Sequence, residues 1–266
     1  MSLTSQTKKR VALRNENSFV IKEVIMRKLV SRQTFLITLF SLILVSGLIF
    51  SQERRIAPVT VGQSMPDFSL PAYQGGEVTL SSLKGKNVLL IFPRGFAREA
   101  SWCHIDNYRY AELMDLEKKK NLREKYDLEI LYVLPYSQEV VKEWVESNPE
   151  QLDHIEEWKN PSDPEKLDER GKRRMKFAKS AFPKSFSFKK GEVPTPFPIL
   201  IDGERQVSKG LGIFATEWSG SKVDQCISSV FIVDKGGILQ FKYIGQNTSD
   251  RPSFDYLIKM LENINK

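Results

Sequence analysis

The chain has 266 residues, of which 41% are hydrophobic, and it carries a formal net charge of +7. This length fits one domain of about 200 residues with extensions, and the apolar content excludes a wholly disordered chain. Residues 1–55 hold ten Lys/Arg against three acidic residues, and the remainder holds 30 of each sign. A nucleic-acid-binding protein needs a basic excess on its folded part, so this distribution argues against nucleic acid as a partner.

Residues 34–50, TFLITLFSLILVSGLIF, form an uncharged apolar segment that follows the basic residues Arg27, Lys28 and Arg32. Seventeen residues is short for a transmembrane helix and long for the apolar part of a signal peptide. The basic flank predicts that the N-terminal side stays in the cytoplasm and that the C-terminal part is extracytoplasmic. No A-x-A-like cleavage site follows the segment, so we interpret it as an uncleaved signal anchor. Export after cleavage is the alternative, and Met26 is an alternative start.

These features divide the chain into a basic N-terminal segment (1–33), a transmembrane or signal-anchor helix (34–50), a linker (51–61) and one domain (62–266). The domain begins with two short predicted strands about Gly75-Gly76 and a helical turn that starts at Ser81 or Ser82. The apolar run 87–92 then predicts a strand that is buried on both faces.

The next predicted elements are a helix over 103–125, a strand over 127–134 and a helix over 137–147 that Ser137 caps. Residues 148–192 are charged and rich in Pro, Lys and Ser, and we interpret them as an insertion with one helix within 165–182. The last predicted elements are a strand (197–202), a short helix (205–211), a hairpin (229–234 and 238–245) and a helix (251–263). This order predicts an α/β fold with a mixed central sheet and helices on both faces.

The same order resembles the thioredoxin superfamily, and three segments are similar to redoxins of the alkyl hydroperoxide reductase and thiol-specific antioxidant type. These segments are GQSMPDFSLPAYQGGEVTLSSLKGKNVLLIF, FPILIDGERQVSKGLGIF and SVFIVDKGGILQFKYIG. The resemblance implies a thioredoxin-like fold and a peroxiredoxin-like thiol oxidoreductase. It also implies a peroxide or disulfide substrate, a thiol reductant, and neither a metal nor an organic cofactor.

A fourth segment supplies the candidate nucleophile, Cys103. Family members with the pattern R-G-x-W-C-P-x-C are matched by Arg94-Gly95 and Trp102-Cys103, and Asp106 stands in place of the second cysteine. Cys103 is expected at a loop-to-helix junction, where free N–H groups and the helix dipole favour a thiolate. The negative charge of Asp106 opposes the thiolate. The alternative is that Cys103 is a small buried hydrophobic residue.

The resemblance also suggests roles for four other residues. Arg94 or Arg98 would stabilise the thiolate, and Ser228 occupies the place of a cis-proline in thioredoxins and often of an arginine in peroxiredoxins. Cys226 lies on a loop that faces the active-site cysteine in this fold. It would resolve a Cys103 sulfenic acid, form a stable bridge with Cys103, or remain unpaired and buried.

We therefore expect a membrane-anchored or exported thiol-dependent oxidoreductase. The alternative is a catalytically degenerate binding or assembly module of the cell envelope, with the 148–192 insertion as its contact surface. His104 and His154 are too few for a zinc site. The basic run within 165–179 is interpreted as a solvated helix face, with contact to anionic lipid as the alternative.

Overall fold

The computed structural model describes residues 59–265, which belong to the unit Ile56–Lys266. The predicted anchor lies outside the described residues, as does most of the predicted linker. Within residues 59–265, no helix is long and apolar enough to cross a membrane.

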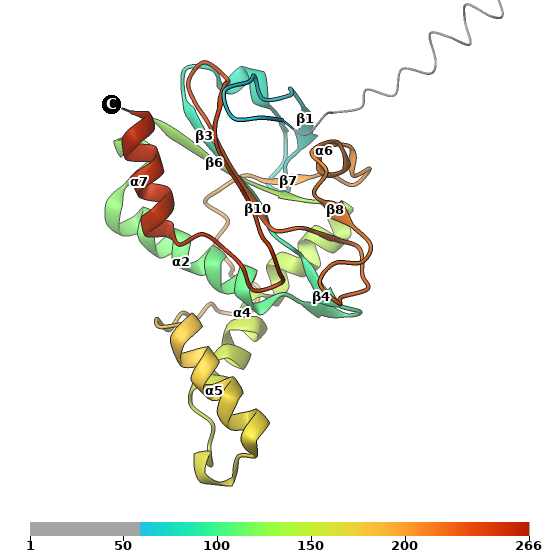
Figure 1. Cartoon of the computed structure of the whole chain (residues 1–266), viewed down its shortest axis with the longest axis vertical. Coiled ribbons are helices and arrows are strands. Elements are labelled where there is room, and N and C mark those ends of the chain that lie inside the picture. Colours follow the sequence, from blue (N-terminus) through green and yellow to red (C-terminus); the bar gives the residue numbers. More distant parts are fainter. Residues whose placement is uncertain (1–58, 266) are drawn as a thin grey trace, which may run out of the picture. The chain divides into compact units, whose positions relative to one another are not determined.

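A five-stranded mixed sheet forms the centre of the described unit (Figure 1). Its strand order is β11-β10-β3-β6-β7, in which β3, β6 and β7 are parallel and β10 runs antiparallel to both β3 and β11. The strands are β3 (Asn87–Phe92), β6 (Leu128–Leu134), β7 (Ile199–Ile201), β10 (Ser229–Val233) and β11 (Leu239–Ile244). Each lies within a predicted strand, which confirms the expected mixed α/β architecture.

Alternate residues of these strands point into two separate apolar clusters. Leu89 and Ile130 face the first cluster, whereas Leu90 and Leu131 face the second, as the two-residue period of a strand requires. The first cluster is covered by α2 (His104–Lys120), α4 (Gln138–Lys159) and α7 (Phe254–Ile264). The second is covered by β1 (Ser69–Pro71), β2 (Glu77–Thr79), the 3₁₀ helix η1 (Leu80–Leu83) and α6 (Gln206–Gly210).

The helix predicted over 103–125 is interrupted at Asn121. This residue has φ 47 and ψ 51, which is the left-handed conformation that commonly ends a helix. Its amide donates to Glu117 O, and the short helix α3 (Leu122–Lys125) follows. The predicted apolar pattern of the helix continues past Asn121 to Leu122, so the spacing of apolar residues did not reveal the break.

The prediction that the next helix ends at 147 is wrong, because α4 continues for another three turns to Lys159. Pro149 has no N–H to donate to Val145 O, which normally ends a helix. Here the side-chain amide of Asn148 donates to Val145 O at 3.3 Å and to Trp144 O at 3.1 Å. The residue that precedes the proline therefore supplies the missing hydrogen bond, and the helix continues.

The rest of the predicted insertion folds back along the outer part of α4. It comprises η2 (Pro164–Lys166) and α5 (Glu169–Ala181), and the Asp168 side chain caps α5 by accepting from the Gly171 amide. Figure 1 shows α5 at one end of the molecule, away from the central sheet. A third apolar cluster, which includes Tyr108, Ile155 and Phe182, holds this region against α2.

Two small antiparallel sheets were not predicted: β4 (Phe96–Arg98) with β5 (Ser101–Trp102), and β8 (Phe214–Ala215) with β9 (Gln225–Cys226). An isolated bridge between Gly95 and Gln225 connects them. These pairs matter because β5 ends next to Cys103 and β9 contains Cys226.

Candidate active site

Cys103 lies between the end of β5 and the start of α2, where it is the N-cap residue of the helix. Its amide donates to Gly95 O at 2.9 Å, and its side chain is almost fully buried, with 3% exposed. The Asp106 amide, one turn into the helix, lowers the pKa of the sulfur. The prediction that Cys103 begins the helix after the first buried strand is confirmed by this placement.

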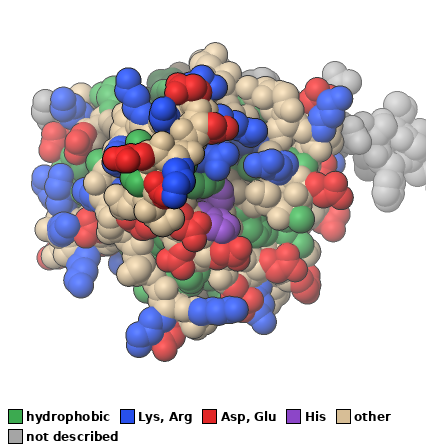
Figure 2. Space-filling view, turned by 90° about the horizontal axis from the view of Figure 1, so that it is seen from below, with side chains coloured by type: hydrophobic (Ala, Val, Ile, Leu, Met, Phe, Trp, Pro, Cys, Tyr) green, Lys and Arg blue, Asp and Glu red, His purple; other side chains and the backbone are tan. Residues whose placement is uncertain are grey.

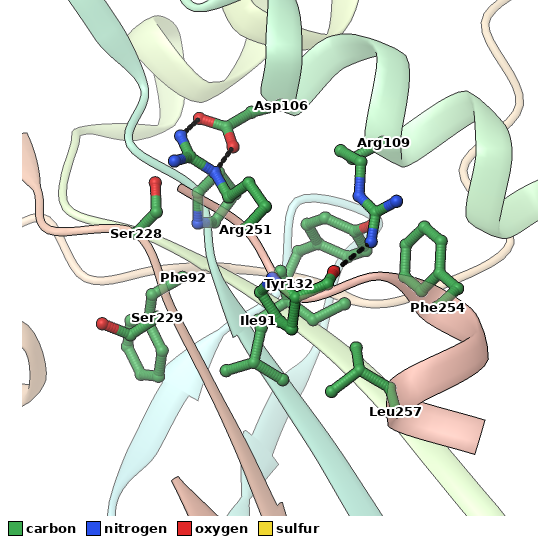
Figure 3. Close-up of a pocket in the computed structure, with 13 residues that line it drawn as sticks. Ile91, Phe92, Asp106, Arg109, Tyr132, Ser228, Ser229, Arg251, Phe254 and Leu257 are labelled. Atoms are coloured by element: carbon green, nitrogen blue, oxygen red, sulfur yellow. Dashed lines mark hydrogen bonds and ion pairs between the residues drawn. The ribbon is translucent and has the colours of Figure 1, made fainter. Parts of the chain in front are cut away.

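Arg251, on the segment between β11 and α7, is the cation that contacts the sulfur among the described residues. Its Nη2 lies 3.8 Å from Cys103 Sγ. The same guanidinium holds Asp106 with two contacts, Nε to Oδ1 at 2.8 Å and Nη2 to Oδ2 at 3.1 Å (Figure 3). Both partners are nearly buried, so Asp106, Arg251 and Cys103 form one coupled group.

Burial is the largest cause that raises the pKa of the Cys103 thiol, to about 11, and the negative charge of Asp106 adds to it. The Arg251 charge, the Asp106 amide and the Arg94 charge act in the opposite direction. Arg251 is already neutralised by Asp106, so its effect on the sulfur is limited. The site therefore holds a protonated thiol at neutral pH.

The structure places the two arginines that were predicted to stabilise the thiolate in different surroundings. Arg94 is buried, and its guanidinium donates to Gln225 Oε1 at 2.7 Å and to Ala97 O at 2.8 Å. Its amide donates to Asp106 Oδ2, so its backbone also contacts the coupled group. Arg98 is exposed at the end of β4.

Cys226 is fully buried, and both cysteines are free thiols. Its amide donates to Arg94 O at 3.1 Å, whereas the Cys103 amide donates to Gly95 O. This segment pairs with Gln225 of β9 through Gly95 and with Trp102 of β5 through Phe96, so it lies between the two cysteines. Two strand spacings amount to about 9–10 Å. A disulfide requires Cα atoms within about 7 Å, so pairing would require the Arg94-Gly95 segment to move.

Ser228 is buried, and its hydroxyl has no hydrogen-bond partner within the described residues. It lines a cavity of about 30 Å³ together with Asp106, Arg251 and Arg109 (Figure 3). Tyr132 lines the same cavity, and its hydroxyl is likewise buried without a partner. A cavity of this size accommodates one or two water-sized molecules beside the ion pair of Asp106 and Arg251.

The two histidines of the chain lie together at the surface, beside the first turn of α2 (Figure 2). The ring centroids of His104 and His154 are 5.8 Å apart, and the His104 ring also packs edge-on against Trp158 at 4.5 Å. Burial lowers the pKa of His104, and the charges of His154 and Arg98 lower it further. Within the described residues, no group of three or more potential ligands among His, Cys, Asp and Glu is placed to hold a metal ion.

Arg251 is the site residue that sequence reasoning missed. It lies 148 positions after Cys103, and no motif connects the two. The only local signal is its place directly before a capped helix, since the Ser253 side chain accepts from the Tyr256 amide at the start of α7. Tyr136 was also missed. Its hydroxyl accepts from the Phe96 amide and donates to Asp224 O, which connects β4 to the loop before β9.

The solved structures that are similar to this chain include two peroxiredoxins. A cysteine-to-serine mutant of peroxiredoxin 6 from Arenicola marina is 14% identical, with 77% of this chain and 72% of that chain covered and a TM-score of 0.49. The reduced 2-Cys peroxiredoxin of Plasmodium vivax is 18% identical, with 77% and 81% covered and a TM-score of 0.46. No curated protein matches the sequence.

The AhpC/TSA family model matches residues 61–242, a range that includes strands β3, β6, β7 and β10 of the central sheet, most of β11, Cys103 and Cys226. This range exceeds half of the chain. The protein therefore belongs to the AhpC/TSA family of peroxiredoxin-like thiol oxidoreductases.

Proposed function

We propose that the protein is a thiol peroxidase in which Cys103 is the nucleophile that reduces a peroxide, with disulfide exchange as a second reaction of the same sulfur. One observation carries this proposal: the Cys103 sulfur lies at the N-terminal end of α2 and 3.8 Å from Arg251 Nη2. A helix N-terminus and an adjacent guanidinium both stabilise a thiolate. The neighbouring cavity supports the proposal, because Asp106 and Arg251, the residues coupled to the sulfur, line it and it has room for a small peroxide.

In the proposed reaction the Cys103 thiolate attacks one peroxide oxygen, and the O–O bond breaks. The other oxygen takes up a proton and leaves as water or an alcohol, so the peroxide is reduced and the sulfur is oxidised to a sulfenic acid. A thiol reductant then attacks the sulfenic acid, which releases water and gives a mixed disulfide. A second thiol from the reductant releases Cys103 as a free thiol.

The raised pKa sets the expected pH dependence of this reaction. With the pKa raised to about 11, only a small fraction of Cys103 is thiolate at pH 7. The proposed peroxidase is accordingly slow at neutral pH. Its rate rises about tenfold for each unit of pH until the pH approaches the pKa.

We also propose that Cys226 does not resolve the sulfenic acid unless the segment between the two cysteines moves. Both cysteine amides are bonded to that segment, and Cys226 is fully buried. An external thiol is therefore the proposed reductant. Replacement of Cys226 by serine leaves this route intact, so turnover with an added small-molecule thiol should not change. A loss of turnover would instead assign resolution to Cys226.

The location of the protein is a separate proposal. The apolar segment 34–50 and its basic flank support a single-pass anchor with the domain outside the cytoplasm, or export after cleavage. A membrane-impermeant biotin label that reacts with lysines of the domain in intact cells would support this orientation. Labelling that appears only after the cells are lysed would contradict it.

A second candidate function is a binding or assembly module that has lost catalysis. The observations in its favour are the burial of Cys103 and the raised pKa of its thiol. A cysteine that only packs in the apolar core would also be buried and would also have a raised pKa.

One experiment separates the two functions. The full-length protein is treated with hydrogen peroxide between about pH 7 and pH 10, and sulfenic acid is trapped with dimedone and located by mass spectrometry. We expect an adduct at Cys103 whose formation rate rises about tenfold per pH unit. The Cys226→Ser variant should behave like the wild type, and Cys103→Ser should give no adduct. The absence of any adduct at Cys103 across this range would favour the binding module.

A further inference from the structure

The 148–192 region and the start of α4 carry two charged surfaces of opposite sign. Figure 2 shows this end of the molecule with both acidic and basic side chains exposed. We call the first the acidic stripe, and it consists of six exposed carboxylates of α4. Its members are Glu139, Glu143, Glu146, Glu150, Asp153 and Glu157.

The spacing of the acidic stripe alternates between four and three residues, which places all six carboxylates on one side of a helix. The opposite side of α4 contains the buried residues, among them Val141, Trp144 and Leu152. The stripe therefore points away from the protein. Within the described residues, only Glu146 has an ion-pair partner, Lys142 at 3.8 Å.

The second surface, the basic face, consists of four exposed residues of α5 spaced three apart. They are Arg170, Arg173, Lys176 and Lys179, and none forms an ion pair with another described residue. Phe177, 45% exposed, lies among them and is one of three large hydrophobic side chains that the described unit exposes to this degree. The buried side of α5, with Ala178 and Phe182, packs against α4 and α2.

Charge is strongly segregated in this region. Residues 166–190 hold ten Lys/Arg and two acidic residues, whereas the rest of 59–265 holds 19 Lys/Arg and 28 acidic residues. Although α4 and α5 pack against each other, no ion pair joins the acidic stripe to the basic face within one copy of the described unit. Each surface is thus left without a partner of opposite charge.

We propose that these two surfaces bind each other between two copies of the chain, so that the basic face of each copy contacts the acidic stripe of the other. Because both surfaces occur on the same chain, one two-fold axis satisfies both contacts at once and closes the assembly as a dimer. Phe177 supplies an apolar contact within the charged interface.

A second copy of the chain would bind both the acidic stripe and the basic face, whereas a lipid surface or a basic protein would bind only one of them. An anionic lipid surface would attract the basic face but repel the six carboxylates of the neighbouring helix. A basic protein partner would leave the basic face unexplained. Charge complementarity within the chain therefore favours self-association.

The test uses full-length protein in detergent, so that any contribution of residues 1–58 is the same in every variant. Isotopically heavy and light protein are mixed and treated with a carbodiimide, which couples a carboxylate to a lysine amine. We expect heavy–light cross-links that join Lys176 or Lys179 to the acidic stripe. We expect them to decrease severalfold as salt is raised from about 0.05 M to 0.5 M, because exposed charges are screened.

Charge reversal gives the sharper readout. Arg173→Glu with Lys176→Glu should weaken self-association at least tenfold, as should Glu150→Lys with Asp153→Lys, because each places like charges opposite one another. The chain that carries all four substitutions should associate again, because its surfaces are again complementary. The matched control is Lys118→Glu with Lys120→Glu at the exposed end of α2, which changes the net charge equally and should leave association unchanged.

Several outcomes would overturn the proposal. One is a monomer without heavy–light cross-links in the wild type, a result that no folding defect of a variant can explain. Another is that the variant with all four substitutions fails to associate although its circular dichroism and melting temperature match those of the wild type. A third is a monomeric wild type that binds vesicles of phosphatidylglycerol and phosphatidylcholine through Arg173 and Lys176, which would assign the basic face to lipid.

Discussion

Charged residues have different roles around Cys103 and on the exposed surfaces of α4 and α5. Around Cys103, Asp106 and Arg251 are both buried and paired with each other, and their charges act with burial on the pKa of the sulfur. On α4 and α5, the charges are exposed and mostly unpaired. Buried charges are costly to leave unpaired, whereas exposed charges contribute little to folding. The first region is therefore expected to resist substitution, and the second to tolerate it.

Arg251→Met should have the largest effect on stability. It leaves the Asp106 carboxylate buried without its guanidinium partner, which should reduce the free energy of unfolding by about 3–5 kcal/mol. Urea denaturation followed by tryptophan fluorescence measures this loss. The double variant Arg251→Met with Asp106→Asn is the control, because it removes both charges and should recover a large part of the stability. A loss below about 1 kcal/mol in the single variant would show that the pair is solvated.

Gly95→Ala should have the next largest effect. Gly95 has φ +80, and a Cβ atom there would overlap the ring and hydroxyl of Tyr136. We expect a loss of about 2–3 kcal/mol from strain and overpacking, together with a displaced Cys103, whose amide is bonded to Gly95 O. Thermal unfolding measures the loss. Gly75→Ala is the control, because its φ is also positive but no atom lies within 4 Å of its Cβ position.

Asp106→Asn should change the reactivity of the sulfur in the folded chain. Burial and the Asp106 charge raise the pKa of Cys103, and Arg251 lowers it. Removal of the negative charge leaves the Arg251 cation to stabilise the thiolate, so the pKa should fall by about one unit or more. The rate of iodoacetamide alkylation should rise about tenfold at pH 8. If the alkylation rate of the folded variant does not change, burial alone controls the pKa of the Cys103 thiol.

The smallest effect is expected on α5. Arg173→Glu with Lys176→Glu should change the free energy of unfolding by less than about 0.5 kcal/mol, because neither side chain has an ion-pair partner among the described residues. Denaturation at low protein concentration isolates this quantity from any self-association. A much larger loss would mean that these side chains stabilise the packing of α5, and would weaken the contrast between the two regions.

Several parts of the fold could be predicted from local patterns. The apolar runs of β3 and β6 marked strands buried on both faces, and Lys235-Gly236-Gly237 marked the hairpin between β10 and β11. In each case neighbouring residues decide the conformation. The end of α4 was mispredicted for a related reason, since a proline is a local helix breaker and its compensation by the Asn148 side chain is a detail of geometry.

The sequence by itself determined the family resemblance, the order of strands and helices along the chain and the place of Cys103 at the start of a helix. All three follow from short-range patterns of apolar and turn residues. Only the tertiary structure brought Arg251 to Cys103 and Asp106, because a contact between residues 148 positions apart depends on how the segment before α7 packs against α2. It also placed the Arg94-Gly95 segment between the two cysteines. The protonation of Cys103 is therefore a property of the fold, because it arises from burial and from charges that meet only in three dimensions.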